Sequence, residues 1–156
     1  MRFLQAQRLL VLTGTLLLAG LLALAAPRLA ARLHRWQQRR QATATTRALA
    51  ASLREGDLLF QTFTSAQSQA IQLATHSPYS HCGLLVRTPG GEWQVLEAVQ
   101  PVCRTPLARW VARGQGGHCV VKRPRDADQV LTPAALVRLR AAGQPLLGRP
   151  YDLAFG

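Results

Sequence analysis

Two residues near the middle of the chain, His81 and Glu97, are of the types that activate a nucleophile. His81 begins the apolar run HCGLLV, and Glu97 lies within the apolar run VLEAV. A carboxylate in a buried strand needs a partner, because an unpaired buried charge is costly. An imidazole that an acid orients can deprotonate a hydroxyl or a thiol. From spacing alone, however, the pattern favours a strand-edge histidine and a glutamate that pairs with an arginine.

A nucleophile is harder to find. Cys82 is adjacent to His81 in a predicted strand and therefore points to the opposite face. Cys103 lies in the proline-bracketed stretch PVCRTP, and Cys119, in the strand-like HCVVK, is predicted to be a small buried thiol. Three serines are predicted to be helix-cap and turn residues: Ser65, Ser68 and Ser80. None of these side chains is favoured as the nucleophile.

The sequence predicts no metal or cofactor site. Its three cysteines are an odd number without a CxxC pair, which argues against a disulfide framework and against a structural zinc site. The GxSxG, HExxH, P-loop and GxGxxG motifs are also missing from the sequence. With 156 residues and a hydrophobic fraction of 48%, the chain can form one folded domain and is not a disordered segment.

Positive charge is concentrated in the first third of the chain. Residues 1–50 contain eight arginines and no acidic residue, whereas residues 51–156 contain all seven acidic residues. The formal net charge of +12 therefore describes mainly the N-terminal part. Such a charge is also found in nucleic-acid-binding proteins. The basic cluster directly follows an apolar segment, so we expect a membrane partner and no nucleic acid.

The apolar segment Leu9–Ala26 is 18 residues long and carries no charge, and about 17–25 such residues span a bilayer. Arg2 and Arg8 precede it, and Ala23-Leu24-Ala25 fits a signal-cleavage site. Residues 1–27 are therefore predicted to be either a retained transmembrane anchor or a cleaved signal peptide. We expect inner-membrane localisation with the domain on the periplasmic (extracytoplasmic) side, or secretion after signal cleavage.

Residues 28–53 are predicted to be a basic helical tether beside the membrane. Leu29, Leu33 and Trp36 recur at helical spacing, and arginines occupy the other faces. The folded domain is expected over residues 54–156. Its predicted elements, in chain order, are a strand at 58–60, a helix at 66–75 with Ala70, Ile71 and Ala74 buried, a hairpin with strands at 82–86 and 93–98, a short helix at 106–113, a strand at 118–122 and a helix that begins after Thr132. This order predicts an α+β domain around an antiparallel sheet.

The hairpin register decides whether His81 and Glu97 share a face. A three-residue loop over 88–90 places Leu85 opposite Trp93 and His81 opposite Glu97, on one face. A four-residue loop would turn Glu97 to the other face, because side chains alternate with a period of two. We expect the first register.

Four stretches of the domain carry a resemblance: GDLLFQ (56–61), SAQSQAIQLATHSPYSHCGLLV (65–86), VLEA (95–98) and GRPYD (148–152). They resemble the permuted papain-like amidases of the YaeF/YiiX type, relatives of the NlpC-type cell-wall hydrolases. The resemblance extends over about residues 54–155 and implies a circularly permuted papain-like α+β fold. It further implies that His81 is the catalytic histidine and Glu97 its acidic partner.

The resemblance also implies a nucleophilic cysteine shortly after the PYD motif, at a helix N-terminus that lowers the thiol pKa. This sequence ends at Gly156, four residues after Asp152. We therefore expect a truncated or inactive member, whose sheet face around Gly83 and Leu85 lacks the cysteine-bearing helix as a cover. The implied function is a membrane-associated amidase or peptidase, with cell-wall peptide as the leading substrate class. The alternative is a catalytically dead module that binds an amide- or lipid-containing ligand.

Overall fold

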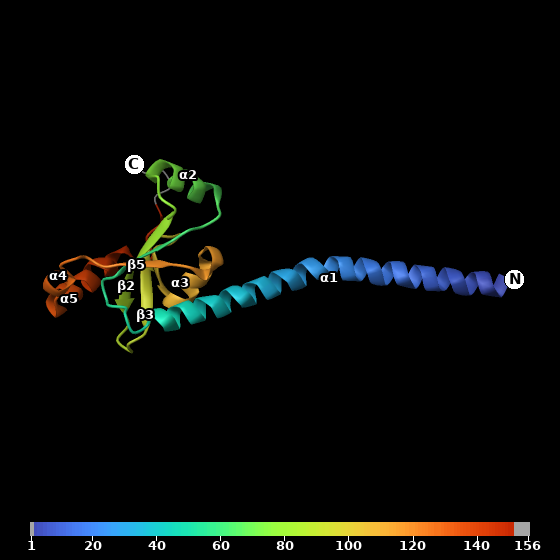
Figure 1. Ribbon diagram of the computed structural model, residues 1–156, viewed down its shortest axis with the longest axis horizontal. Helices are drawn as coiled ribbons and strands as arrows, with labels where there is room; N and C mark the ends of the chain where they lie inside the picture. The colour runs from blue at the N-terminus through green and yellow to red at the C-terminus, as the bar shows by residue number, and fades with distance from the viewer. Residues whose placement is uncertain (1, 152–156) are drawn as a thin grey trace. The chain divides into compact units, whose positions relative to one another are not determined.

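The structure, a computed structural model, describes residues 2–151 apart from the side chains of residues 2–13 and 16–19 (Figure 1). The chain divides into two compact units, Met1–Gln37 and Gln38–Gly156. Helix α1 (Arg2–Leu49) provides the first unit and continues into the second. The second unit therefore begins before Arg54, where the sequence predicts the start of the domain.

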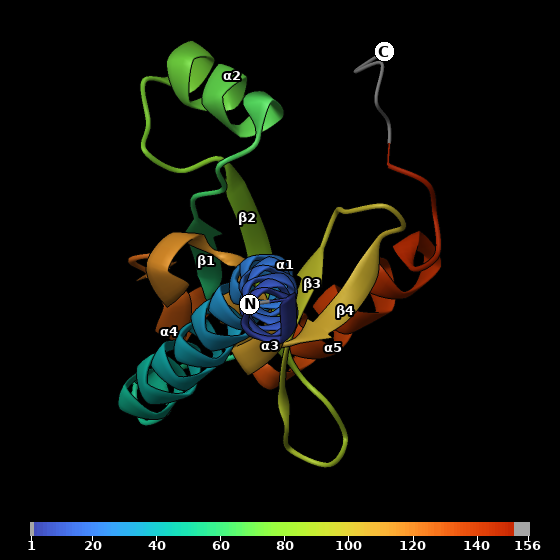
Figure 2. The ribbon, with the colours of Figure 1, turned by 90° about the vertical axis from the view of Figure 1, so that its right-hand side faces the viewer.

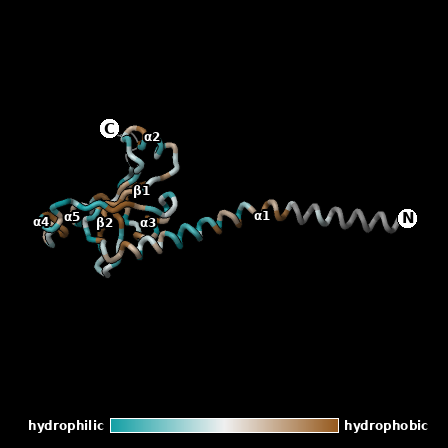
Figure 3. The backbone as a smooth tube through the Cα atoms, in the orientation of Figure 1, coloured by the Kyte–Doolittle hydropathy of each residue, from teal (hydrophilic) through white to brown (hydrophobic). Residues whose placement is uncertain are grey.

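Half of the predicted membrane segment Leu9–Ala26 lies outside the described side chains. Within the described part of the chain, no helix has the length and apolar character needed to cross a membrane. Figure 3 shows mixed polar and apolar character along the described part of α1, whereas the strands of the second unit are mainly apolar. The prediction of an anchor or signal at residues 1–27 thus stays a prediction.

A five-stranded antiparallel sheet forms the centre of the second unit, with the strand order β4-β3-β2-β1-β5. Its strands are β1 (Leu58–Gln61), β2 (His81–Arg87), β3 (Trp93–Glu97), β4 (Cys103–Pro106) and β5 (Val120–Lys122). Besides the end of α1, the helices of the second unit are α2 (Ala66–Thr75), α3 (Leu107–Arg113), α4 (Ala127–Val130) and α5 (Pro133–Gly143). Two 3₁₀ turns are η1 (Gln115–Gly117) and η2 (Gln144–Leu146). The α+β class with an antiparallel sheet is confirmed.

Local capping determines where the two longer helices of this unit begin. The Ser65 side chain accepts a hydrogen bond from the Ser68 backbone at the start of α2, and Thr132 does the same for α5. Helix α2 therefore spans the predicted residues. Its predicted buried face is wrong, because Ala70 and Ala74 are exposed and Ser68 is its one buried residue. Figure 2 shows the reason, since α2 lies beyond the end of β2 and not on a face of the sheet.

The hydrophobic core covers the sheet face that we expected to be open. Leu59, Leu85 and Val95 of the sheet are fully buried against Trp110 and Val111 of α3. The end of α1 and the segment after it add Ala42 and Leu53. The expected gap over Gly83 and Leu85 is therefore wrong, because α3 and the last turns of α1 supply the cover.

The hairpin pairs Leu85 with Val95 and Arg87 with Trp93. The predicted pairing of Leu85 with Trp93 is therefore wrong by two residues. The loop contains five residues, 88–92, and the Thr88 backbone N–H closes it by donating to Glu92 O at 2.9 Å. A shift of two residues preserves the face of every side chain. His81 and Glu97 consequently lie on the same face, as predicted.

Gly83 is required by close packing in β2. A Cβ added at this position would lie 2.2 Å from Val95 Cγ1 and 3.3 Å from Leu96 O. We expect Gly83→Ala to lower the free energy of unfolding by about 1–3 kcal/mol, because overpacking displaces buried side chains. Chemical denaturation would measure the change. Gly90→Ala is the matched control, since its added Cβ meets Thr88 Oγ1 at an ordinary 3.7 Å; equal stability of the two variants would contradict the packing argument.

Candidate active site

His81 and Glu97 form a hydrogen-bonded pair on the core face of the hairpin. His81 Nε2 lies 2.7 Å from Glu97 Oε2, and their side chains are 13% and 0% exposed. One further step in the β2–β3 register places Glu97 opposite Gly83, so the pair is a diagonal one. Diagonal partners are within reach of long side chains.

Two aromatic rings lie against the imidazole of His81. The Phe63 ring stacks on His81 with centroids 5.1 Å apart, and the Trp110 ring lies tilted at 6.0 Å. Trp110 comes from α3 in the core, and Phe63 from the segment between β1 and α2. The ring therefore has little rotational freedom, which favours a fixed orientation toward Glu97.

Glu97 accepts hydrogen bonds from three side chains. Besides His81, Thr105 Oγ1 donates to Oε1 at 2.5 Å, and Arg113 Nη2 donates to both carboxylate oxygens, at 2.5 Å to Oε2. Burial by itself would raise the pKa of Glu97, but the hydrogen bonds from His81, Thr105 and Arg113 and the Arg113 charge together lower it to about 2. Glu97 is therefore a carboxylate at neutral pH.

This lowered pKa has a consequence for acid stability. A carboxyl group whose pKa falls from 4.5 to about 2 on folding stabilises the protein above pH 4.5. That contribution, on the order of 3 kcal/mol, is lost as the pH falls from about 4.5 to about 2. Urea denaturation at several pH values would measure it. This decrease in the free energy of unfolding should be absent from Glu97→Gln, which has no carboxyl group at this position. An equal decrease in both proteins would contradict the prediction.

The pair leaves one imidazole nitrogen available for chemistry. Because Nε2 faces a carboxylate, it carries the proton, and Nδ1 is the basic nitrogen. The contact with Glu97 uses Nε2 and does not involve Nδ1. His81 lines two adjoining hollows of about 240 and 390 Å³, which also contact Ile71 of α2, Ala98 and Tyr151. The arrangement can accept a proton from a group that binds in these hollows.

None of the three cysteines is hydrogen-bonded to the His81 ring. Cys82 is exposed and lines the larger hollow, and Cys103 Sγ lies 3.6 Å from Thr105 Oγ1. Burial raises the pKa of Cys119, which makes its thiolate scarce at neutral pH. The serines act as predicted: Ser65 caps α2, Ser68 Oγ donates to Phe63 O at 2.6 Å, and Ser80 Oγ accepts from the Phe63 backbone N–H at 3.0 Å.

The sequence predictions missed two of the groups that surround Glu97. Thr105 lies on β4. No strand was predicted there, because two prolines bracket the stretch PVCRTP. Arg113 ends α3, a helix that was predicted without its contact to the hairpin. The sequence left open whether Glu97 pairs with His81 or with an arginine. In the structure this carboxylate binds both, His81 and Arg113.

Comparisons with known proteins show what this chain is similar to. The model of the family described as permuted papain-like amidase enzyme, YaeF/YiiX, C92 family, matches residues 52–156. The uncharacterized protein YiiX of Escherichia coli K12 is 44% identical over 100 residues, which are 64% of this chain and 48% of that protein. A crystal structure titled metalloprotein yiiX, from Escherichia coli O157:H7, superimposes with a TM-score of 0.61 at 44% identity, over 66% of this chain and 55% of that one. The chain thus spans about half the length of these relatives.

Proposed function

The chain belongs to the permuted papain-like amidase family, and on this premise we propose that its second unit carries the base of a cysteine amidase or peptidase. In this proposal His81 is the general base and general acid, and Glu97 holds its tautomer. The observation that carries it is the 2.7 Å contact between His81 Nε2 and a buried carboxylate, at a residue that also lines a cleft. Such an oriented imidazole is the activating half of a nucleophilic triad.

The proposed reaction begins with a thiol in the cleft. Its S–H proton moves to His81 Nδ1, and the sulfur attacks the acyl carbon of the substrate. The C–N bond then breaks, and the imidazolium returns the proton to the leaving nitrogen. Water hydrolyses the resulting thioester and regenerates the thiol. Because none of the cysteines described above contacts the ring, we propose that this chain by itself hydrolyses amides slowly.

The proposed reaction does not use a metal ion. The solved relative is titled a metalloprotein. In this chain, the side chains that the structure describes do not bring three or more His, Cys, Asp or Glu residues together. The described residues therefore provide no donor set for a metal centre, and no step is assigned to one.

The leading substrate class is cell-wall peptide, which would meet a domain on the extracytoplasmic side of a membrane. A binding module for an amide- or lipid-containing ligand is the second candidate. The lining of the two hollows favours it, because the described residues that line them are uncharged apart from His81, among them Phe63, Ile71 and Tyr151. Cell-wall fragments carry carboxylates, so binding of a neutral ligand in preference to such fragments would support the second candidate.

Membrane association is proposed from α1. Its arginines at positions 28, 32, 35 and 39 recur at helical spacing, and exposed Leu29, Leu33 and Trp36 lie beside them. We expect deletion of residues 1–27 to release the protein from a membrane fraction. Release at low salt would show that residues 1–27 alone hold the protein there, whereas release only at high salt would show that these arginines also bind anionic lipid. Retention of the deleted protein at high salt would contradict an anchor in residues 1–27.

A thiol added in solution tests the proposed base. The full chain with all three cysteines replaced by serine is mixed with 2-mercaptoethanol and p-nitrophenyl acetate, and release of p-nitrophenolate is followed. We expect the protein to accelerate thiolysis at least about tenfold relative to its His81→Asn variant, because general-base catalysis contributes about 10²–10⁴-fold when well positioned. Equal rates for two folded proteins would refute the role of His81.

A further inference from the structure

The guanidinium of Arg113 shares the Glu97 carboxylate with His81. Arg113 Nη2 donates to both carboxylate oxygens, and the two contacts to Oε2 are 2.5 Å from Arg113 Nη2 and 2.7 Å from His81 Nε2. Arginine stays protonated in proteins, whereas an imidazole gains and loses its proton near neutral pH. The charge of Glu97 is therefore opposed by a permanent cation whether or not His81 is protonated.

Helix α3 holds this arginine against the sheet. Arg113 lies three residues after Trp110, and residues at this spacing share a helix face. Trp110 is fully buried in the core, and its ring centroid lies 6.0 Å from that of His81. The side chain of Arg113 is 37% exposed, whereas that of Glu97 is 0% exposed. The guanidinium thus keeps contact with water while it pairs with a carboxylate that has none.

Charge balance distinguishes this cluster from a simple histidine–carboxylate pair. A carboxylate beside an imidazole favours the imidazolium, because opposite charges attract. With Arg113 present, the charges of the guanidinium and the Glu97 carboxylate sum to zero, so a proton added to His81 would create a second cation beside the first. A general base must be a neutral imidazole. The arrangement therefore favours the form of His81 that can accept a proton.

The other ionisable side chains that the described residues place beside this pair are two thiols and a phenol. Cys103 lies opposite Glu97 in the β3–β4 register, and Cys82 and Tyr151 line the hollow that contains His81. Thiols and phenols are neutral when protonated, and phenols ionise above the pH range measured below. The thiols are absent from a protein in which serine replaces all three cysteines, so their ionisation does not enter the test.

We propose that Arg113 is a positioning residue of this site, which pairs with Glu97 so that His81 stays in its neutral, proton-accepting form. The inference rests on the proposed function, because it assigns a role within the same site. Arg113 neither gains nor loses a proton in the reaction. The S–H proton still moves to His81 Nδ1, and Arg113 affects only how much of the enzyme has that nitrogen unprotonated.

NMR of the ring nitrogens of His81 tests the proposal without any thiol or substrate. The parent protein is the full chain with all three cysteines replaced by serine, and its His81 signal is the one missing from the His81→Asn variant. The signal is followed from about pH 5 to 9. We expect Arg113→Met to raise the pH midpoint of this signal by at least about one pH unit, because a nearby charge changes such an equilibrium by about one to three pH units. Equal midpoints, or a lower one in the variant, would overturn the proposal.

Two further variants separate the charge of Arg113 from its packing. Arg113→Lys keeps the cation and should retain a midpoint closer to that of the parent than to that of Arg113→Met. Arg109→Met removes an exposed arginine from the same helix and should leave the midpoint unchanged. If Arg113→Lys behaves like Arg113→Met, or if Arg109→Met raises the midpoint as much, the pairing of Arg113 with Glu97 is not the cause and the proposal fails.

The thiolysis assay provides a second readout, as the His81-dependent rate of Arg113→Met divided by that of the parent. A midpoint higher by one pH unit leaves about a tenth of the neutral imidazole below both midpoints. We therefore expect a ratio of about 0.1 or less at the acidic end of the range and a ratio near 1 at its basic end. A ratio that is low and independent of pH would indicate a structural role and overturn the proposal. If no protein shows His81-dependent thiolysis, the proposed function fails, whereas the NMR midpoints still decide the role of Arg113.

Discussion

Glu97→Gln is expected to slow His81-dependent thiolysis by about 10²–10⁴-fold, in the three-cysteine-to-serine background described above. The carboxylate accepts from three donors at once: His81 Nε2–H, Thr105 Oγ1–H and Arg113 Nη2–H. A glutamine presents an NH₂ group in place of one acceptor oxygen. That group would face a donor, so the imidazole would turn or adopt the other tautomer, in which Nδ1 carries the proton and cannot act as a base.

Thr105→Val is the matched control for this prediction. It removes one hydrogen bond to Glu97 Oε1 and leaves the contact between Glu97 and His81 intact. We expect a loss of thiolysis well below that of Glu97→Gln. Circular dichroism of each variant would show that the comparison is between folded proteins. A folded Glu97→Gln protein with the parent rate would remove Glu97 from the mechanism, and the acid-stability role would remain.

The shared face of His81 and Glu97 was predictable because it depends on parity alone. Any odd number of loop residues between β2 and β3 places both side chains on one face. The five-residue loop and the predicted three-residue loop therefore give the same face. The length itself was not predictable from Pro89-Gly90-Gly91, because the loop is closed by Thr88, whose Oγ1 accepts from the Glu92 backbone N–H at 3.0 Å.

The remaining groups of the site depend on contacts between distant segments. Arg113 reaches Glu97 across 16 residues of sequence, and Thr105 reaches it across eight. Neither residue has a local pattern that indicates its partner. The same reason explains the early start of the second unit, because Thr45 of α1 donates to Gly117 O, 72 residues away. Helix caps and strand alternation can be predicted from a single sequence, because they depend on neighbouring residues. Contacts between residues distant in the sequence can be identified only once the fold is known.

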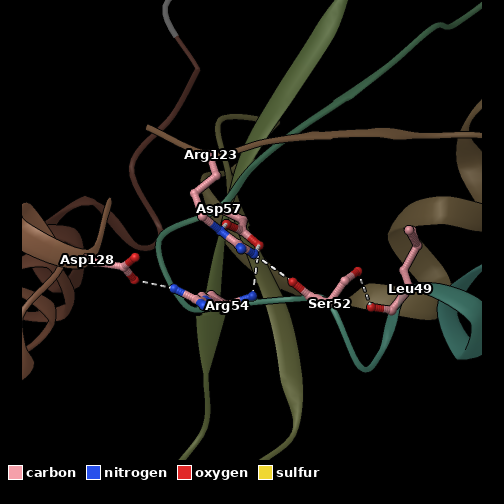
Figure 4. Close-up of polar contacts among 6 residues, drawn as sticks. All are labelled: Leu49, Ser52, Arg54, Asp57, Arg123 and Asp128. Atoms are coloured by element: carbon pink, nitrogen blue, oxygen red, sulfur yellow. Dashed lines mark hydrogen bonds and ion pairs between the residues drawn. The ribbon is translucent and has the colours of Figure 1, made fainter. Parts of the chain in front are cut away.

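The GD pair of the GDLLFQ stretch has a structural role in this fold and lies apart from His81. Gly56 has a φ of 91°, a conformation that favours glycine, and an added Cβ would lie 2.8 Å from Leu131 Cδ1. Asp57 is 0% exposed and accepts hydrogen bonds from the Arg54 backbone N–H at 2.8 Å and from Arg123 Nε at 2.6 Å (Figure 4). Arg123 Nη2 also donates to Ser52 O at 2.6 Å.

Asp57→Ala is therefore expected to lower the free energy of unfolding by about 1–3 kcal/mol, because it removes the buried carboxylate that accepts from Arg123 and from the Arg54 backbone. The change would be measured by urea denaturation at neutral pH. Asp128→Ala is the matched control, since the ion pair of Asp128 with Arg54 lies at the surface, with the two side chains 87% and 58% exposed. Exposed pairs contribute about 0–1 kcal/mol.

The double variant Asp57→Ala/Arg123→Met separates the charge pair from the loss of side-chain volume. If the buried pair is the cause, removing both partners should cost less than the sum of the two single changes, by about 0.5–3 kcal/mol. A methionine retains apolar contacts of the Arg123 stem without carrying an unpaired charge. If the effects of the two substitutions on the free energy of unfolding are strictly additive, the Asp57–Arg123 ion pair contributes nothing to stability. Asp57 would then act only through its hydrogen bond from the Arg54 backbone.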